Sequence, residues 1–505
     1  MKDPATDKLD VLLISEGTYP FYGGGISTWS HMLCDRVSNA NFSLYSINAG
    51  FEPEPIFELS PSVKEIIQVP LWAPDEPQDY MSFRRDYYKV VKKKEQTTSQ
   101  VIRERFVPIF EKFIQLVYAE TTNMGMMDLV FYEMWEYFQE YDYKETLQAK
   151  SVWDAFKAEA TSEAERDGSF TASLFDVTVG LRWLYRFLIP FSIPISKKDL
   201  CHITLSGFPL IPALVLKYRY GTPLMITEHG VYVRERLLYI NRSDYSYFIK
   251  DFLIKLTEAI TRLSYYKADK ILSVNQFNIT WELMYGATED KIEITYNGVD
   301  HERFSPREKP DHLKGIPTVV AAARIFELKD ILTMIRSCAI VREKIPNVQY
   351  LVYGDKNAVP EYTKKCEDLI KELKLENNFF LKGYHNKPHL IFSEGDISIL
   401  TSISEGFPFT VIESMSCGVP VVATDVGGVA EAIDAGSGFV CKPRDARAIG
   451  EKVVELLSND ALRESMSKHG RQRVIDNFTL EIFIESYERI YEEVFAGKQV
   501  KRKVS

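Results

Sequence analysis

The sequence predicts an α/β protein built from two Rossmann-like, doubly wound parallel-sheet domains that face each other across a cleft. A chain of 505 residues is too long for one ordinary core. Short apolar runs alternate with helical segments in both halves of the chain, as in doubly wound sheets. A polar, proline-containing stretch at about 301–317 separates the two halves and is the best linker between domains.

The first half opens like a doubly wound domain. The apolar run 10–15 predicts a strand that is buried on both faces. A glycine-rich turn at 23–25, an amphipathic helix at about 26–37 and a second strand at 42–47 follow. Strand, glycine turn, helix and strand in this order are typical of a nucleotide-binding α/β domain.

A helical insertion is predicted at about 75–190, where aromatic and charged residues recur at helical spacing with few strand signals. The α/β alternation then returns, with strands expected at 200–204, 223–227, 270–274 and 291–295 and helices near 209–218 and 245–267. We therefore expect a first domain at 1–305, completed by a C-terminal helix at about 480–505.

The second domain is expected at 306–479 and alternates regularly. Its predicted strands are 317–322, 348–353, 378–381, 396–400, 420–423 and 437–440, and its last helices lie near 446–458 and 460–475. The intervals between strands are long enough for the helical crossovers that a parallel sheet requires.

Composition limits the class of partner. A net charge of −10 argues against nucleic acid, whose phosphates demand clustered Lys and Arg. The six cysteines have no CxxC spacing and are expected as reduced thiols. The first ten residues lack the apolar segment of a signal peptide, and the apolar run 187–195 is too short to span a bilayer. We expect a soluble cytoplasmic protein, either free or bound peripherally at the inner face of the membrane.

The glycine turn is the first candidate binding element. Gly24 and Gly25 precede a helix, where glycine lets the backbone approach a phosphate and the helix start offers free amides. The dinucleotide fingerprint is incomplete, since Thr28 stands in place of its third glycine. A tight turn without a ligand is an equally good interpretation of these glycines alone.

Arg324 and Lys329 are the second candidate, because they follow a predicted strand at its carboxyl end. Ligands of open α/β sheets bind at that edge. Two cations there can hold a diphosphate and stabilise its charge as it leaves. In isolation, such a pair is more commonly part of a surface salt bridge.

A third candidate is the run Glu405-Gly406-Phe407-Pro408 with Glu413, after the strand 396–400. If a helix starts near Phe409, Glu405 lies in its N-terminal loop and Glu413 about one turn inside. Carboxylates accept hydrogen bonds from diols, so these residues suit a sugar ring and a ribose. In the alternative interpretation, Glu405 only interacts favourably with the helix dipole, and Glu413 lies on a solvent-exposed helix face.

A lone histidine, His229, follows the predicted strand 223–227 in the first half. It is a candidate for reaching a ligand across the cleft, although a single histidine is more often a structural hydrogen-bonding group. No cluster of His and Cys and no Asp-x-Asp at a strand end indicates a metal site. We expect no metal cofactor.

Together these motifs resemble the retaining glycosyltransferases of family 4, which have the GT-B fold. The resemblance runs through most of the chain and rests on the early GGG, the TEHG of His229, Asn297-Gly298-Val299-Asp300, Arg324-x4-Lys329, the Glu405-x7-Glu413 pair and the stretch 404–431. A closer similarity, in residues 15–29, 227–236 and the helical insertion, is to the Pel-type exopolysaccharide glycosyltransferases.

The resemblance implies roles in the second domain. Arg324 and Lys329 would bind the donor diphosphate and stabilise the leaving group. Glu405 would contact the donor sugar, with the backbone amides of Gly406 and Phe407 beside it.

The resemblance also implies the remaining donor contacts. Glu413 would bind the ribose, and Tyr384 would frame the base. Gly24 and Gly25 would lie against the phosphates, and His229 would contact the donor sugar near the reacting carbon.

The sequence departs from the family pattern at three points. Ala323 stands before the arginine where glycine is usual, and Asp330 follows the lysine in place of glycine. The second glycine of a G-x-G turn is missing, since residues 354–356 read Gly-Asp-Lys. These changes leave the charged residues in place and affect the expected phosphate contacts.

The implied function is transfer of a hexose such as glucose from a UDP-sugar to a growing exopolysaccharide or another carbohydrate, with retention at the anomeric carbon. No carboxylate is placed as a covalent nucleophile, so we expect same-face attack in which the departing phosphate accepts the acceptor's proton. The implied partner is a membrane-embedded polysaccharide export complex. Alternatives are a nucleotide-sugar epimerase on the same scaffold and a non-catalytic subunit of a polysaccharide synthase complex.

Overall fold

The computed structural model describes residues 8–50, 54–71, 73, 87–119, 121, 123–167 and 172–504, and the side chains of 163–167 and 498–504 lie outside this description. Parts of the predicted insertion, at 75–86, 120, 122 and 168–171, therefore lie outside the described residues. The chain forms two compact units, the first made of Met1–Leu272, Thr280–Glu293 and Tyr487–Ser505 and the second of Ser273–Ile279 and Ile294–Ser486.

The first unit contains a seven-stranded sheet in the order β3-β2-β1-β4-β5-β6-β7. Its strands are β1 (Leu9–Glu16), β2 (Ala40–Asn48), β3 (Val63–Pro70), β4 (Leu200–Ile203), β5 (Leu224–Glu228), β6 (Lys270–Ser273) and β7 (Ile292–Ile294). The pairs β1–β2, β2–β3, β1–β4 and β4–β5 are parallel. The strand order reverses between β1 and β4, and open α/β sheets bind ligands outside the carboxyl ends of the strands at such a switch point.

The helices of the first unit fall into a Rossmann-like set and an insertion. The Rossmann-like set is α1 (Gly25–Arg36), α10 (Leu210–Tyr220), α11 (Tyr232–Arg242), α12 (Tyr247–Lys267) and, shared with the second unit, α13 (Gln276–Met284). The insertion contains α3 (Tyr87–Gln96), α4 (Ser99–Val101), α5 (Val107–Tyr118), α6 (Met124–Glu140), α7 (Tyr143–Leu147), α8 (Lys150–Asp167) and α9 (Leu174–Leu188).

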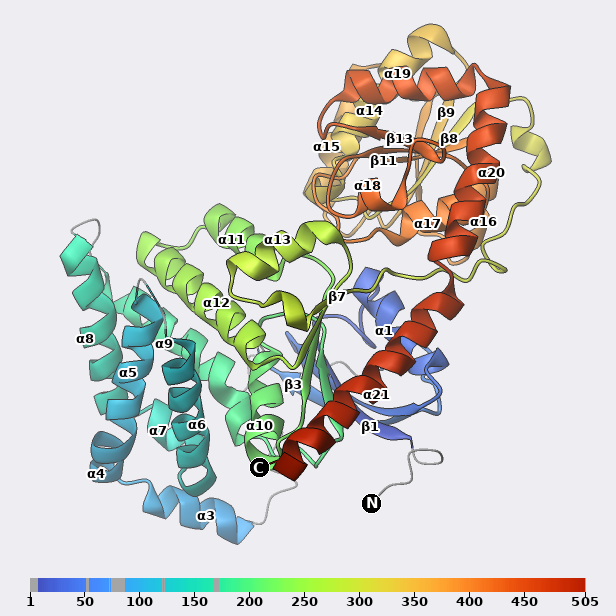
Figure 1. Cartoon of the computed structure of the whole chain (residues 1–505). Helices are drawn as coiled ribbons and strands as arrows, with labels where there is room; N and C mark the ends of the chain where they lie inside the picture. Colours follow the sequence, from blue (N-terminus) through green and yellow to red (C-terminus); the bar gives the residue numbers. More distant parts are fainter. Residues whose placement is uncertain are drawn as a thin grey trace. The chain divides into compact units, whose positions relative to one another are not determined.

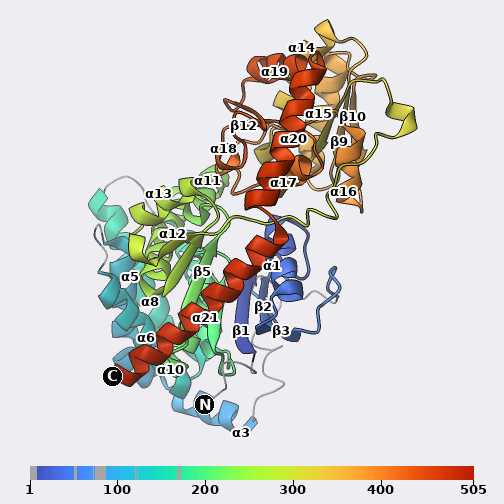
Figure 2. The same cartoon turned by 45° about the vertical axis from the view of Figure 1, so that its right-hand side comes forward.

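The insertion helices pack on one another and on α12 through aromatic side chains. Figures 1 and 2 show α5, α6 and α8 as a group beside the sheet of this unit. Phe106, Phe110 and Phe113 are fully buried at its centre, and Phe156 meets Phe252 of α12 with ring centroids 5.4 Å apart. The insertion is therefore an extension of the first unit's own hydrophobic core.

The last helix, α21 (Leu480–Val504), supplies buried side chains to the first unit from Tyr487 onward. The Tyr487 hydroxyl accepts a hydrogen bond of 3.2 Å from the indole of Trp29 on α1. The Tyr491 hydroxyl lies 2.9 Å from Nδ1 of His202 on β4. A helix at the end of the chain is thus part of the core formed by its beginning.

The second unit contains a six-stranded parallel sheet in the order β10-β9-β8-β11-β12-β13. The strands are β8 (Thr318–Ala322), β9 (Gln349–Tyr353), β10 (Phe379–Gly383), β11 (Ile397–Leu400), β12 (Val421–Thr424) and β13 (Gly438–Cys441). The helices are α14 (Ile331–Lys344), α15 (Pro360–Glu372), α16 (Pro388–Ile391), α17 (Phe409–Ser416), α18 (Val429–Ala432), α19 (Ala446–Leu457) and α20 (Asp460–Asn477). The switch point lies between β8 and β11.

The predicted pair of Rossmann-like parallel-sheet domains with a helical insertion is confirmed. Strand β3 and helix α11 were not among the predicted elements. β3 is only partly buried along most of its length, so its sequence lacks the continuous apolar run of the central strands. Within the described residues, no helix is both long enough and apolar enough to cross a bilayer.

Candidate functional site

In the second unit, the predicted charged residues come together at the switch point of the sheet. Arg324 and Lys329 follow β8, and Glu405 follows β11, the neighbouring strand. Because both strands are parallel, their carboxyl ends meet at one edge, where the loops that follow them can share a ligand.

Lys329 and Glu405 form an ion pair. The Lys329 Nζ lies 2.5 Å from the Glu405 Oε1, and the Ser402 hydroxyl donates to the same oxygen at 2.5 Å. The side chains are 21% and 10% exposed, so the pair is largely shielded from water. The hydroxyl of Thr401 also donates to the backbone oxygen of Lys329 at 3.0 Å, which ties the two loops together.

Arg324 differs from Lys329 in its environment. Its side chain is exposed, and its guanidinium carbon lies 4.8 Å from the ring centroid of Phe326. Among the described residues it has no ion-pair or hydrogen-bond partner. The guanidinium can therefore offer its planar set of donors to an anion without first breaking an internal pair.

The loops at this edge are packed so closely that two positions accept only glycine. A Cβ on Gly427 would lie 2.0 Å from the backbone oxygen of Glu405, and Gly427 has φ of +54°. A Cβ on Gly354 would lie 1.9 Å from the backbone oxygen of Ala323. These close contacts fix the backbone position of Glu405 and that of Ala323, the residue before Arg324.

Asp330 occupies the position where the family pattern has glycine, and the structure shows how it fits. Its φ is +45°, in the left-handed region, which aspartate tolerates better than most residues. Its side chain caps α14 by accepting from the amide and hydroxyl of Thr333. The capping interaction compensates for a backbone conformation that glycine would adopt freely.

Phe407 contributes to the site through its backbone, since its side chain is 3% exposed and packs on Tyr296 and Phe478. Its backbone oxygen accepts a buried hydrogen bond of 2.7 Å from Asn297. Gly406 accepts from the amide of Gly428 at 2.7 Å. The loop before α17 is therefore held in place from two sides.

Glu413 lies inside α17, which begins at Phe409 as predicted. Burial raises the pKa of its carboxyl group to about 7, and the nearby Arg303 opposes this shift. A carboxyl group with this pKa is part protonated near neutral pH, which is typical of groups in recessed functional sites. Tyr384, directly after β10, is 79% exposed and leaves a free aromatic face.

In the first unit, the glycine turn connects β1 to α1. Gly24 is the N-cap of α1, with φ of +150°, and no Cβ contact limits substitution at either Gly23 or Gly24. The turn therefore depends on backbone conformation and leaves space beside Gly24, so an approach of a ligand to the backbone is sterically allowed.

His229 follows β5 and is held by an aromatic contact. Its ring lies 4.5 Å from that of Trp29 in an edge-on arrangement. Burial lowers its pKa to about 3, so the imidazole is neutral at physiological pH. Its Nε2 is buried without a hydrogen-bond partner among the described residues. A neutral ring with an unpartnered nitrogen is able to bind a hydroxyl group.

Two residues that sequence reasoning had not singled out join this edge of the first sheet. Glu16 is the last residue of β1, and Arg236 lies on α11, shortly after His229. Both stand within motifs that the resemblance already quoted, residues 15–29 and 227–236. For Glu16 the sequence signal was a charged residue at the end of a buried strand, whereas Arg236, inside a helix, had no such signal.

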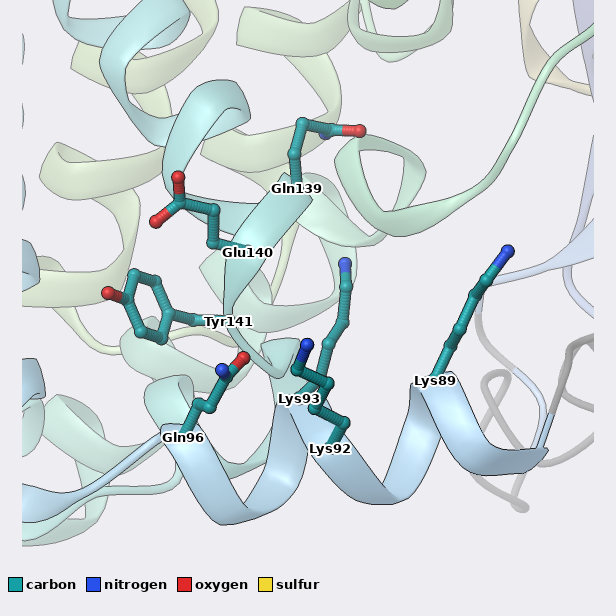
Figure 3. A pocket seen from close by; sticks show the side chains of 7 residues that line it. All are labelled: Lys89, Lys92, Lys93, Gln96, Gln139, Glu140 and Tyr141. Carbon is teal, nitrogen blue, oxygen red and sulfur yellow. The ribbon is translucent and has the colours of Figure 1, made fainter.

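A separate basic pocket lies in the insertion, away from all of these predicted residues. It has a volume of about 520 Å³ and is lined by Lys89, Lys92, Lys93, Gln96, Gln139, Glu140 and Tyr141. Figure 3 shows the lysines rising from one face of α3 toward the end of α6. Lys93 donates to the backbone oxygen of Phe138 at 2.9 Å, and Glu140 pairs with Arg105. Among the described residues, no group of three or more acidic, His or Cys side chains is arranged to hold a metal ion.

Comparison with known families defines the class of protein. Residues 9–290 match the family described as "Domain of unknown function (DUF3492)", and residues 303–473 match "Glycosyl transferases group 1". The first match covers more than half of the chain, so the chain belongs to the DUF3492 family. The match to group 1 glycosyl transferases lies entirely within the second unit.

Solved structures show the same GT-B architecture. A glycosyltransferase from Rickettsia africae aligns over 96% of this chain and 98% of its own, with a TM-score of 0.56 and 18% identity. Sucrose-phosphate synthase from Thermosynechococcus elongatus aligns over 97% and 100%, with a TM-score of 0.61 and 16% identity. At these identities the similarity establishes the fold.

Curated relatives are glycosyltransferases that match part of the chain. The 2-deoxystreptamine N-acetyl-D-glucosaminyltransferase of Niallia circulans is 26% identical over 59% of this chain and 76% of its own. The N-acetyl-alpha-D-glucosaminyl L-malate synthase of Bacillus anthracis is 25% identical over 46% and 62%. The capsular polysaccharide glycosyltransferase CapM of Staphylococcus aureus is 29% identical over 41% and 56%. The chain thus spans about half to three quarters of the length of these three relatives.

Proposed function

We propose that this chain is a retaining glycosyltransferase that transfers a hexose from a UDP-sugar to a growing exopolysaccharide or another carbohydrate. The observation that carries the proposal is the grouping of Arg324, Lys329 and Glu405 at the switch point of a group 1 glycosyl transferase domain. Two cations next to a carboxylate suit two parts of a donor: a diphosphate that is lost and a sugar with hydroxyl groups.

In this proposal, Arg324 and Lys329 bind the diphosphate, and Glu405 binds the donor sugar. Without donor, Lys329 and Glu405 neutralise each other. A bound diphosphate would compete for the Lys329 ammonium and leave a carboxylate oxygen of Glu405 available to sugar hydroxyls. Before the donor arrives, the ion pair would hold the two side chains near the positions in which they bind the donor.

The remaining proposed donor contacts extend from this pair. Glu413 binds the two ribose hydroxyls, Tyr384 stacks on the base, and the amides of Gly406 and Phe407 lie beside the sugar. In the first unit, Gly24 and Gly25 approach the phosphates. His229 contacts the donor sugar through its neutral ring.

The proposed reaction proceeds with retention and needs no metal cofactor, since two side-chain cations are available to neutralise the leaving diphosphate. The acceptor hydroxyl attacks from the face that the phosphate leaves, and the phosphate oxygen takes its proton. The enzyme contributes positioning and charge stabilisation. An inverted product, seen in the anomeric proton couplings by NMR, would rule this out.

Two further features support the exopolysaccharide role. The motifs at 15–29 and 227–236 resemble those of the Pel-type enzyme PelF. Among the relatives, CapM is named for capsular polysaccharide biosynthesis and the WcaL proteins for putative colanic acid biosynthesis. The HepE protein of Anabaena, which shares the fold with a TM-score of 0.57, is described in complex with UDP and glucose. We extend the proposal to UDP-glucose as donor and to work with a membrane-embedded export complex.

The deciding experiment is calorimetric titration with UDP, ADP and GDP, followed by their glucose conjugates. We expect UDP and UDP-glucose to bind preferentially. If no nucleotide binds at millimolar concentration, the protein is better explained as a non-catalytic subunit. If UDP-glucose is converted to its epimer without any acceptor, the protein is an epimerase.

A further inference from the structure

The first unit carries a polar cluster at the carboxyl edge of its sheet that the proposed donor contacts leave unused. It consists of Glu16, Tyr232 and Arg236. Glu16 ends β1, one of the two strands at the switch point, and the other two residues lie on α11, which follows β5. We call these three residues the Glu16 cluster.

The Glu16 cluster holds polar atoms that the protein itself does not satisfy. Glu16 Oε2 and Arg236 Nε are both buried and have no hydrogen-bond partner among the described residues. The Arg236 guanidinium carbon lies 5.5 Å from the ring centroid of Tyr239, which holds that side chain on the helix surface. Native proteins rarely leave buried polar atoms unsatisfied, so these two atoms are available to a bound polar group.

The three side chains influence one another. Burial raises the pKa of Glu16 to about 7, and the positive charge of Arg236 opposes this shift. Burial also raises the pKa of Tyr232 well above its ordinary value, with a further contribution from Glu16. The three side chains are therefore linked electrostatically.

The surroundings of the cluster fix its geometry. A Cβ on Gly207, in the segment after β4, would lie 2.4 Å from the Tyr232 ring, so this ring lies directly on the Gly207 backbone. The end of β1 and the segments after β4 and β5 therefore meet at the cluster. A site on the ends of packed strands is held more rigidly than one on a free loop.

The chemistry of the cluster fits a neutral sugar. A carboxyl group can accept from two adjacent hydroxyls, while a guanidinium and a phenol donate to hydroxyl and ring oxygens. The carboxyl of Glu228, at the end of β5, also acts electrostatically on Tyr232. Glu16 supplies a carboxyl acceptor and Arg236 a cationic donor, so the cluster as a whole favours neither an anion nor a cation, and a neutral polyol matches both groups.

We propose that Glu16 and Arg236, with Tyr232, bind the hydroxyl groups of a neutral saccharide and so select the carbohydrate acceptor. This inference rests on the proposed glycosyltransferase function, since it names the substrate class of the acceptor side. Glu16 and Arg236 then act as residues that determine acceptor specificity, and donor binding does not depend on them.

The test is saturation-transfer NMR with three neutral trisaccharides, cellotriose, maltotriose and chitotriose, in the presence of UDP. We expect the wild-type protein to bind at least one of them, and Glu16→Gln and Arg236→Ala to weaken that binding at least tenfold. Glu65→Gln on β3 and Arg242→Ala on α11 are matched controls, because both side chains are exposed, and they should bind like the wild type. Arg236→Lys serves if the alanine variant does not fold.

UDP titration of the same samples separates the two hypotheses. If the wild-type protein does not bind UDP, the result contradicts the glycosyltransferase function itself. If UDP binds normally, the acceptor assignment is overturned when no neutral trisaccharide binds, or when Glu16→Gln and Arg236→Ala match their controls. It is also overturned if a glucuronate-containing trisaccharide binds more tightly than every neutral one.

Discussion

The two sheets present their charged groups at equivalent edges but in opposite states. In the second unit, Lys329 and Glu405 are paired and further tied by Ser402. In the first unit, Glu16 and Arg236 keep buried atoms that have no partner among the described residues. Lys329 and Glu405 follow the two strands that flank the switch point of their sheet, whereas Glu16 ends such a strand and Arg236 follows β5, one strand further along its sheet.

The difference indicates two ways of preparing a ligand site. An internal ion pair keeps its members ordered, and it can be replaced by a ligand that offers an anionic group to the lysine and hydroxyl groups to the carboxylate. Buried polar groups without partners lower the stability of the free protein, because they have lost their hydrogen bonds to water. A ligand whose hydroxyls bond to these groups removes that free-energy cost. The first arrangement suits a charged donor, and the second suits a neutral acceptor.

The largest expected effect tests the cations of the second unit. Arg324→Ala and Lys329→Ala should each lower turnover by ~10²–10³, because each removes charge stabilisation from the leaving group. Lys382→Ala, at an exposed lysine on β10, is the control and should retain turnover. The measurement is initial rate with UDP-sugar, and full activity in both site variants would mean that the site lies elsewhere.

Stability should separate the same two variants. Lys329→Ala leaves Glu405 with the Ser402 hydrogen bond but without its cation, and should lower the free energy of unfolding by about 2 kcal/mol. Arg324→Ala should leave it nearly unchanged, because that side chain is exposed. Equal melting temperatures for the two variants would contradict the contrast between a paired and an unpaired cation.

A backbone substitution tests how tightly the second site is held. Gly427→Ala places a Cβ 2.0 Å from the Glu405 backbone oxygen, so the loop must move. Gly315→Ala is a matched control, since Gly315 also has positive φ, at +76°, but no atom lies within 4 Å of its Cβ position. We expect Gly427→Ala to lower the melting temperature and UDP-sugar affinity more than Gly315→Ala, as calorimetry can measure.

Glu413 gives a smaller effect that depends on pH. Its pKa in the folded protein is raised from 4.5 to about 7, so folding favours its protonated form. Its contribution to stability is present below pH 4.5 and is lost as pH rises toward and through 7. Wild-type stability should therefore fall more steeply over this range than that of Glu413→Gln. Melting temperatures of the two proteins that change in parallel with pH would contradict the shift.

Glu413→Ala should also weaken UDP binding about tenfold, consistent with one lost charged hydrogen bond.

The smallest expected effect concerns Tyr384. Its ring is largely exposed, so removing it should cost only its stacking on the base, about 0.5–1.5 kcal/mol of UDP binding. Tyr384→Phe is the control, because it keeps the ring and should keep the affinity. UDP titration that shows no difference between Tyr384→Ala and the wild type would remove this residue from the proposed site.

The sequence by itself determined the two-sheet architecture and which charged residues follow the strands at the switch point of the second sheet. Strands such as β1 and β8 are continuous apolar runs because both of their faces are buried, and that pattern is readable without a structure. The charged residues after β8 and β11 stand at fixed spacing, so their position at one sheet edge followed from topology.

Only the tertiary structure decided which of these groups meet. Lys329 and Glu405 are 76 positions apart, and their pairing depends on how two loops pack around Gly427. Glu16 and Arg236 looked like ordinary charged residues, because burial and the lack of a partner are properties of the folded environment. Sequence patterns report the burial of whole elements, whereas the state of a single polar side chain depends on neighbours that are distant in the chain.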